Sequence, residues 1–381
     1  MKLLRQLETI FRYQMGILTA GIPSQVYLVI NEKCNLTCQF CNFWKGIYQK
    51  EGRDVLSTSE IKSLILKMAD LQIPYLTITG GEPFLREDMI SVLRYAVRHI
   101  PHVRVQTNGT LITDSIAERI VKHGLLDEIW ISLDGIDSTH DKLRGKDGTF
   151  EEVIKGLNRI TYFKKKHKSP FPYIIIHTVV NKFNLNELSQ LLNICIKYKV
   201  GEWFVSYVTD ITEERLRATG QTLDYADFSS LQMTSAGRLL AYDHKLSFEL
   251  LRQMSSARKK GLTIFVDYLL KRGTSFYPRR KCILLWASIM VSPYAEVLTC
   301  PMLDKYVMGD LRKEDLMKVW NNDKFKKVRS LVAERSLPIC EDCCCQRRSI
   351  LDHLKDPANF KRIFVPRKLR EIIYKHHIPV P

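Results

Sequence analysis

The segment Gln25-Val-Tyr-Leu-Val-Ile-Asn-Glu-Lys-Cys34-Asn-Leu-Thr-Cys38-Gln-Phe-Cys41 joins an apolar, strand-like run to a tight group of cysteines. The spacing is C-x3-C-x2-C, and the first histidine that follows is His99. Three thiolates from one loop can hold three irons of a [4Fe–4S] cluster, which leaves the fourth iron open to a substrate. The alternative is a structural zinc site, but such sites usually complete four protein ligands.

Length and composition are those of a large domain followed by a smaller one. The chain has 381 residues, 45% of them hydrophobic, and no apolar run is long enough to cross a membrane. The apolar stretch 15–22 is short and interrupted by glycines, which is unlike a signal peptide. Most of the 10 cysteines fall in two groups with metal-ligand spacing, so we expect a reducing cytoplasm rather than an exported protein.

The charge balance is strongly basic, with a net charge of +17. Such a balance suits nucleic acid, an acidic substrate or a membrane surface. No common nucleic-acid-binding signature is present, so nucleic acid is not an expected partner. Residues 1–24 have the pattern of an amphipathic helix that either caps the open end of a barrel or lies on a membrane. The basic tail 348–381 is either solvated or a second membrane contact.

From residue 25 to 208, apolar strands alternate with amphipathic helices. Strands are expected at 26–30, 75–79, 103–106, 128–133, 173–180 and 203–208, and helices at 59–71, 86–99, 114–123, 150–166 and 185–198. This alternation predicts an α/β domain in which helices cover a parallel sheet. In such domains the chemistry lies in loops at the carboxyl ends of the strands.

Glycine-rich and polar motifs follow three of these strands. They are Thr79-Gly80-Gly81-Glu82-Pro83, Thr107-Asn108-Gly109, and Ser132-Leu-Asp134-Gly135 with the later Arg144-Gly145. Taken singly, each has a plain interpretation: Gly-Gly-Glu-Pro and Asp-Gly are turn sequences, and Arg144 is a surface charge. Because the motifs follow successive strand ends, their order favours one shared binding site.

Together these features resemble the radical S-adenosylmethionine (radical SAM) superfamily. The cysteine motif after the first strand and Gly-Gly-Glu-Pro after the second carry the resemblance. It implies a partial (β/α)6 barrel and a [4Fe–4S] cluster held by the catalytic cysteines Cys34, Cys38 and Cys41. It also implies reductive cleavage of SAM to methionine and a 5′-deoxyadenosyl radical, which abstracts hydrogen from an unactivated C–H bond. An external electron donor such as flavodoxin or ferredoxin is then needed.

The same resemblance implies SAM contacts for the loop residues. The stretch Gly80-Gly81-Glu82-Pro83 is similar to the motif that holds the methionine amino group. Arg144 would pair with the methionine carboxylate, which suits its planar guanidinium. The other implied contacts are Phe40 against the adenine, Ser132 and Asp134 near the ribose, and Thr107 and Asn108 in the stretch around the ribose and carboxylate.

A second cysteine group resembles the SPASM/twitch extension that carries auxiliary Fe–S clusters in radical SAM enzymes, which implies a β-hairpin between Cys282 and Cys300. Cys282, Cys300, Cys340 and Cys343 would together close one auxiliary [4Fe–4S] cluster. Four thiolates also suit zinc, which is the alternative metal for this site. Since no cysteine follows residue 345, we expect the shorter, twitch-like form with a single auxiliary cluster.

The remaining cysteines have open roles. Cys344 or Cys345 could replace Cys343 as a ligand or donate hydrogen to a substrate radical. Cys195 lies in an apolar helical stretch and is interpreted as a core residue.

The predicted organisation has five segments. They are an amphipathic extension (1–24), a radical SAM partial barrel (25–208), a helical connector (209–275), an auxiliary Fe–S domain (276–347) and a basic tail (348–381). The predicted substrate is a peptide or a small natural-product intermediate, with the auxiliary cluster assisting oxidation, crosslinking or epimerisation. Two alternatives are the same chemistry on a membrane lipid, with the protein peripheral at the membrane, and a non-catalytic metal–thiolate binding module.

Overall fold

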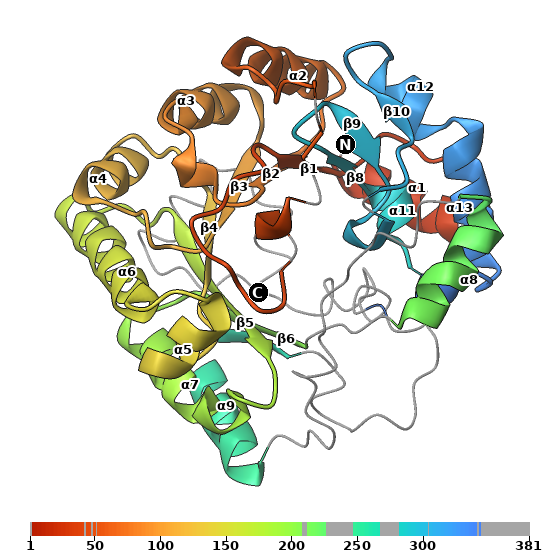
Figure 1. Cartoon of the computed structure of the whole chain (residues 1–381). Coiled ribbons are helices and arrows are strands. Elements are labelled where there is room, and N and C mark those ends of the chain that lie inside the picture. Colours follow the sequence, from red (N-terminus) through yellow and green to blue (C-terminus); the bar gives the residue numbers. More distant parts are fainter. Residues whose placement is uncertain are drawn as a thin grey trace.

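A computed structural model describes residues 2–41, 43–46, 49–50, 52–207, 212–225, 247–266, 282–303, 305–340 and 343. Cys344, Cys345 and the basic tail 348–381 lie outside these residues, as do 209–211, 226–246 and 267–275 of the expected connector. Within the described residues one ten-stranded sheet has the order β10-β9-β8-β1-β2-β3-β4-β5-β6-β7. Helices surround its curved central part (Figure 1).

The predicted partial barrel is present, and its six predicted strands begin and end within one residue of the expected bounds. They pair in parallel as β1 (Gln25–Val29), β2 (Tyr75–Thr79), β3 (His102–Thr107), β4 (Glu128–Ser132), β5 (Tyr173–Val180) and β6 (Glu202–Tyr207). The covering helices are α2 (Thr58–Asp70), α3 (Met89–His99), α4 (Asp114–Lys122), α6 (Thr149–Lys166) and α7 (Leu188–Lys197).

Local sequence explains where these helices begin. The Ser57 side chain accepts from the backbone N–H of Glu60, and the Glu60 carboxylate accepts from the N–H of Ser57, which forms a capping box at the start of α2. Thr113 caps α4 in the same way through the N–H of Ile116. Both caps follow loops at the carboxyl ends of strands, so they fix the directions in which those loops leave the sheet.

Two short strands extend the barrel sheet at both edges: β7, which the sequence did not indicate, and β8, which belongs to the hairpin that the resemblance implied between Cys282 and Cys300. β7 (Thr263–Val266) pairs in parallel with β6 after α8 (Glu213–Leu223) and α9 (Phe248–Lys259), so the expected helical connector contains a strand. At the other edge β8 (Ser288–Val291) pairs in parallel with β1. β8 continues antiparallel into β9 (Glu296–Leu298) and β10 (Gly309–Asp310), so the sheet runs directly into the C-terminal domain.

The C-terminal domain packs α11 (Leu284–Ala287), α12 (Leu316–Trp320) and α13 (Asp323–Ala333) beside this hairpin. Its core includes Trp286, Trp320, Phe325 and the aliphatic part of Arg329, all fully buried. The Arg329 guanidinium donates to the carbonyls of Leu285, Leu18 and Trp320 at 2.8, 3.0 and 2.8 Å. Hydrogen bonding of this kind is what allows a charged group to lie in an apolar core.

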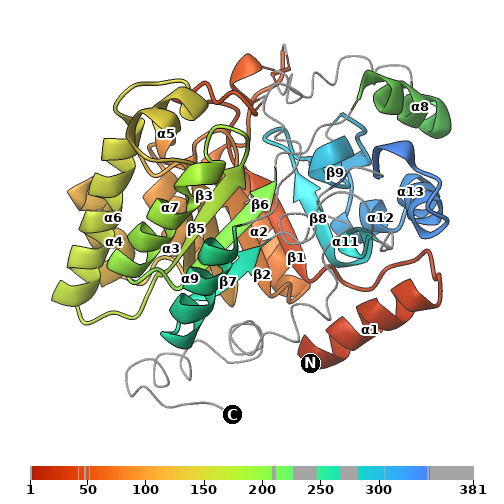
Figure 2. The same ribbon diagram turned by 90° about the horizontal axis from the view of Figure 1, so that it is seen from below.

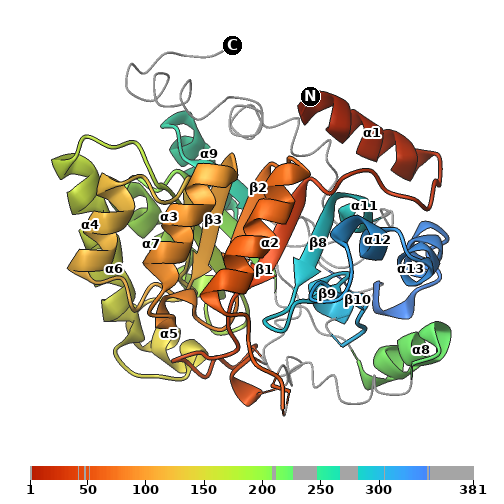
Figure 3. The same cartoon turned by 90° about the horizontal axis from the view of Figure 1, so that it is seen from above.

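Helix α1 (Lys2–Gln14) lies against the C-terminal domain, which corrects the expectation that it caps the barrel. Tyr13 meets Trp286 edge-on at 5.3 Å between ring centroids, and the Trp286 indole donates to the Ile17 carbonyl at 2.8 Å. In Figures 2 and 3, α1 and α5 (Asp137–Arg144) lie at opposite ends of the strands. None of the described helices has the length and apolar character that a membrane span requires.

Candidate active site and auxiliary metal centre

The cysteine loop follows β1 at the carboxyl end of the sheet. Cys38 is buried, while Cys34 and Cys41 are partly exposed. Leu36, between them, is 2% exposed and anchors the loop in the domain. Burial raises the pKa of the Cys41 thiol to about 11 and also raises the pKa of Cys34. Since metals bind the thiolate form, metal binding here must displace these protons.

The paired glycines after β2 pack directly against this loop. A methyl group on Gly81 would lie 2.1 Å from the carbonyl oxygen of Lys33, and one on Gly80 would lie 2.7 Å from the carbonyl oxygen of Asn31. Three hydrogen bonds join the segments, including one from the Glu82 N–H to the Lys33 carbonyl at 2.8 Å. The glycines therefore permit a close approach between the two loops, where the sequence had suggested an approach to a ligand.

Glu82 joins the loops after β2 and β3 through its buried carboxylate. It accepts from the Thr107 hydroxyl and the Asn108 N–H, both at 2.8 Å, and from the Phe84 N–H at 3.1 Å. Burial raises its pKa to about 7, and these hydrogen bonds oppose the shift. The Asn108 side chain donates in turn to Asn35 of the cysteine loop at 2.9 Å. The structure thus brings together Glu82, Thr107 and Asn108 as one group beside the cysteines.

A buried ion pair lies on the other side of the loop. The Arg144 guanidinium pairs with Asp134 and approaches Cys38 Sγ at 3.7 Å. Its central carbon is 5.4 Å from the centroid of the Phe40 ring. Asp134 is fully buried and also accepts from the Val179 N–H at 2.7 Å. Burial raises the pKa of Asp134, and the adjacent guanidinium opposes this shift.

Helix α5, which carries Arg144, was not predicted, and its C-terminus holds the cysteine loop in place. The backbone N–H groups of Thr37 and Gln39 donate to the carbonyls of Arg144 and Leu143 at 3.2 and 2.9 Å. Gly145 ends the helix at φ +72°, and a methyl group there would lie 2.2 Å from the Thr37 hydroxyl. A glycine after a basic helix end is a recognised stop signal, so the sequence did contain a signal for α5.

Two other predicted residues lie apart from these contacts. Ser132 ends β4 and is the register partner of His177 in β5. Cys195 is fully buried in α7, where burial raises the pKa of its thiol, so its interpretation as a core residue is confirmed.

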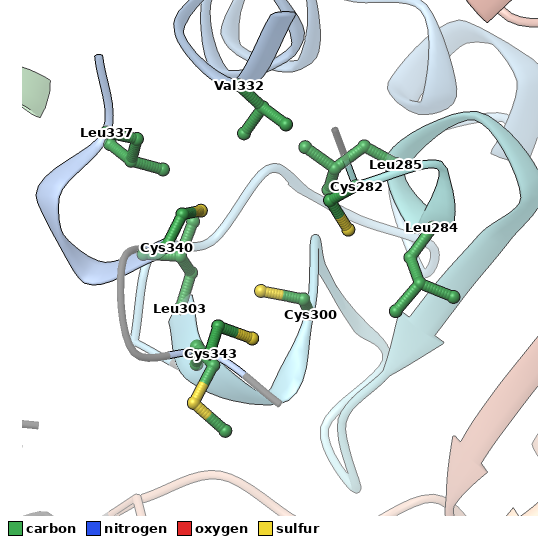
Figure 4. A pocket seen from close by; sticks show the side chains of 10 residues that line it. Cys282, Leu284, Leu285, Cys300, Leu303, Val332, Leu337, Cys340 and Cys343 are labelled. Carbon is green, nitrogen blue, oxygen red and sulfur yellow. The ribbon is translucent and has the colours of Figure 1, made fainter. Parts of the chain in front are cut away.

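The four later cysteines converge on one cavity (Figure 4). Cys282 precedes α11, Cys300 follows β9, and Cys340 and Cys343 come after α13. The other lining residues are all apolar: Leu284, Leu285, Met302, Leu303, Val332 and Leu337. A set of soft thiolates in an apolar shell fits an Fe–S cluster or zinc.

Contacts that the sequence did not indicate connect the barrel to the C-terminal domain. The Tyr294 hydroxyl, in the β8–β9 turn, donates to Glu32 of the cysteine loop. Arg53 lies between two carboxylates of the C-terminal domain, Glu296 at 2.6 Å and Asp310 at 2.9 Å. These partners are far apart in sequence, so local patterns could not have revealed them.

Comparisons with known proteins agree with this geometry. Residues 28–195 match the model of the radical SAM superfamily, and residues 282–344 match that of the SPASM iron–sulfur cluster-binding domain. The AdoMet-dependent heme synthase of Methanosarcina barkeri is 27% identical over 82% of this chain and 86% of its own length. The mycofactocin maturase MftC of Mycolicibacterium smegmatis is 25% identical over 81% of this chain and 72% of its own length.

Solved structures share the fold at lower sequence identity. Streptococcus suis SuiB bound to S-adenosylmethionine superimposes with a TM-score of 0.63, at 16% identity, over 92% of this chain and 78% of SuiB. The anSMEcpe protein with bound AdoMet and the Cp18Cys peptide gives a TM-score of 0.55, at 16% identity, over 93% and 99% of the two chains.

Proposed function

Since this chain is a radical SAM enzyme with a C-terminal SPASM domain and uses SAM and [4Fe–4S] clusters, we propose that it abstracts hydrogen from a C–H bond of a peptide or a small natural-product intermediate. The main support for this proposal is that two neighbouring segments hold the Cys34–Cys41 loop in place. The Gly80–Glu82 turn packs on one side of it, and the end of α5 packs on the other. Such support fixes the positions of the three thiols.

In this proposal Cys34, Cys38 and Cys41 hold the catalytic cluster and leave one iron for SAM. When bound, cluster and SAM together supply the 5′-deoxyadenosyl radical. The protein supplies shape and charge around them. Arg144 places a guanidinium at the Cys38 sulfur, where it offsets negative charge on the thiolates. Glu82 holds the ends of β2 and β3 together, so Thr107 and Asn108 stay beside the loop.

The SAM pocket is proposed to include the residues that the family resemblance named. Phe40, next to Cys41, is the proposed contact for the adenine. The others are Gly80, Gly81, Glu82, Pro83, Thr107, Asn108, Ser132, Asp134 and Arg144. Arg144 already forms an ion pair with Asp134. Its guanidinium would therefore have to bind the SAM carboxylate and Asp134 at the same time.

Cys282, Cys300, Cys340 and Cys343 are proposed to hold one auxiliary [4Fe–4S] cluster. Since the four thiols complete its coordination, this cluster would accept or store an electron and would not bind substrate at iron. The apolar residues of the cavity limit access of water. Exposure to water and hydrogen bonds to the sulfurs are what tune the reduction potential of an Fe–S cluster. This arrangement supports an oxidative outcome after hydrogen abstraction.

The names of the related proteins support both proposed substrate classes. MftC is a maturase, and SuiB has been solved with its precursor peptide SuiA. The heme synthase has a small natural product in its name. An external electron donor is also part of the proposal.

The test is an isotope experiment with the anaerobically reconstituted, reduced enzyme. Candidate peptides and small molecules drawn from the genomic neighbourhood would be deuterated and incubated with SAM. We expect 5′-deoxyadenosine that has gained deuterium from one candidate. Formation of 5′-deoxyadenosine without deuterium from any of them would contradict both proposed substrate classes, while the chemistry would stand.

A further inference from the structure

The proposed function requires one electron from outside the protein for each SAM that is cleaved. That electron has to reach the cysteine loop, so the protein surface nearest the loop is of interest. The inference that follows rests on the proposed function and concerns this surface. It is formed by the loop itself, the short helix Phe43–Lys45 and the end of α5 with the residues after it. These segments lie at the same end of the molecule (Figures 2 and 3).

Trp44 is the first notable feature of this surface. Its indole N–H donates to the backbone carbonyl of Cys38 at 3.0 Å, while the residue is 42% exposed. One side chain therefore contacts both the backbone of a cluster ligand and the solvent. Large exposed aromatic side chains are enriched in protein–protein interfaces, where tryptophan is a frequent hot spot.

Charge is the second feature. Exposed lysines surround the loop: Lys33, Lys45, Lys142 and Lys146. Two of them are placed by contacts with the loop, because the Lys142 carbonyl accepts from the Gln39 side chain at 2.9 Å and the Gly145 carbonyl, next to Lys146, accepts from the Thr37 hydroxyl at 2.9 Å.

The anions of these segments do not cancel this charge. Asp147 is the exposed anion within 142–148. The Asp141 carboxylate is occupied at the start of α6, where it accepts from the N–H groups of Gly148 and Phe150, both at 2.7 Å. The four lysines outnumber the three carboxylates of these segments, Glu32, Asp141 and Asp147, and the Lys45 ammonium lies 5.7 Å from the centroid of the Trp44 ring.

We propose that Trp44 and the surrounding lysines Lys33, Lys45, Lys142 and Lys146 form the docking surface for an acidic, one-electron carrier protein. The carrier is oxidised by one electron, and the cluster held by Cys34, Cys38 and Cys41 is reduced by one electron. Complementary charge accelerates such encounters and makes them sensitive to salt. The contact of Trp44 with Cys38 places a docked carrier beside the cluster loop.

The test compares two reductants of the reconstituted holoenzyme under anaerobic conditions. One is a reduced, strongly acidic flavodoxin, and the other is photoreduced deazaflavin, which is small and uncharged. We expect the double variant Lys45→Glu/Lys146→Glu to lower the second-order rate constant of cluster reduction by flavodoxin about tenfold or more. Reduction by deazaflavin, and SAM cleavage driven by it, should remain as in the unmodified enzyme.

The double variant Lys67→Glu/Lys122→Glu is the matched control, since it changes the net charge equally and both are exposed lysines, in the last turns of α2 and α4. An equal loss in this control would overturn the proposal, because net charge alone would then explain the effect. Unchanged reduction by flavodoxin in the double variant would also overturn it. Absence of SAM cleavage with deazaflavin in the unmodified enzyme would instead contradict the proposed function.

Discussion

The two cysteine sites of this molecule are held in different ways. The Cys34–Cys41 loop is held by hydrogen bonds to three other loops and has a guanidinium and two buried carboxylates beside it. The Cys282–Cys343 site is lined by thiols and hydrocarbon. The first site is polar and partly open, whereas the second is apolar and brings four thiols together.

This difference indicates which chemistry each site can support. Hydrogen bonds and charges around an incomplete ligand set leave room to bind and orient a polar cofactor. A complete thiolate set in an apolar shell favours a cluster that exchanges only electrons. The two domains are joined by the Tyr294–Glu32 contact and the Arg53 ion pairs, so a change at one site can be tested for its effect on the other.

The largest expected effect comes from Gly81→Ala, which disturbs only the polar Cys34–Cys41 site. The added methyl group would lie 2.1 Å from the backbone of Lys33, so the cysteine loop has to move. A displacement of about 1 Å is enough to lower rates about 100-fold. We expect iron to fall from about eight to about four per chain, and formation of 5′-deoxyadenosine to fall at least about 100-fold.

Gly148→Ala is the control for this substitution. Gly148 has a positive φ, +77°, so an added methyl group strains the backbone there, but that methyl group meets open space. It should cost about 1–2 kcal/mol of stability and retain all the iron. Equal iron loss in both variants would show that backbone strain, and not the approach to the cysteine loop, is responsible.

The next largest effect tests the apolar site. The double variant Cys282→Ser/Cys300→Ser should lose the auxiliary cluster and retain about four irons per chain. Cleavage of SAM without product should continue, because the Cys34–Cys41 loop is held by residues of the barrel. Iron analysis, electron paramagnetic resonance and a 5′-deoxyadenosine assay measure these outcomes. Loss of both clusters would show that the two sites are not separate.

A third prediction concerns the charges of the polar site. Arg144→Met leaves the fully buried Asp134 carboxylate without its cation, which should cost about 3–5 kcal/mol of unfolding free energy. Adding Asp134→Leu should restore most of that loss, since no buried charge then remains. Lys155→Ala, which removes only exposed ion pairs, should cost no more than about 1 kcal/mol. Denaturant unfolding of these three variants and of the unmodified protein distinguishes burial of charge from loss of a contact.

The smallest effect is expected at the junction between the two regions. Arg312 bonds Glu60 at 2.6 Å, and the hydrogen bonds from Arg312 and the Ser57 N–H lower the pKa of Glu60 to about 2. Because folding lowers the pKa of Glu60, its ion pair with Arg312 contributes to the free energy of unfolding at neutral pH. This contribution is lost only as the pH falls toward 2. Both groups are partly exposed, so Arg312→Ala should cost at most about 1 kcal/mol, or about 1 °C in melting temperature. A larger loss that is insensitive to salt would contradict this reading.

Much of the barrel could be predicted from sequence because its strands are apolar, long and regularly spaced. β7 was missed since four residues are too few for a periodic pattern to stand out, and β8 is equally short and was implied only by the family resemblance. Helix α5 was missed because it is polar, and only Gly145 at its end marked it. The enzyme class followed from the cysteine spacing, and the alternative of a non-catalytic binding module is not supported, since the related proteins are enzymes.

The sequence predicted which residues form the site, but it did not predict which of them contact one another. Asp134 and Arg144 were both assigned to SAM, yet they pair with each other. The requirement that buried charges be paired could have suggested this, but burial itself is not visible in a turn sequence. Glu32 and Tyr294 were missed because they are 262 residues apart in the chain, and only the fold brings them together.

The central claim is that Cys34, Cys38 and Cys41 hold a cluster that opens to SAM, while the later quartet holds a closed one. The most direct test is anaerobic reconstitution of the enzyme and of its Cys34→Ala/Cys38→Ala/Cys41→Ala variant, followed by iron analysis and a 5′-deoxyadenosine assay. We expect about eight irons and SAM cleavage in the enzyme, and about four irons and no cleavage in the variant. Cleavage of SAM by the variant at the rate of the enzyme would contradict the claim.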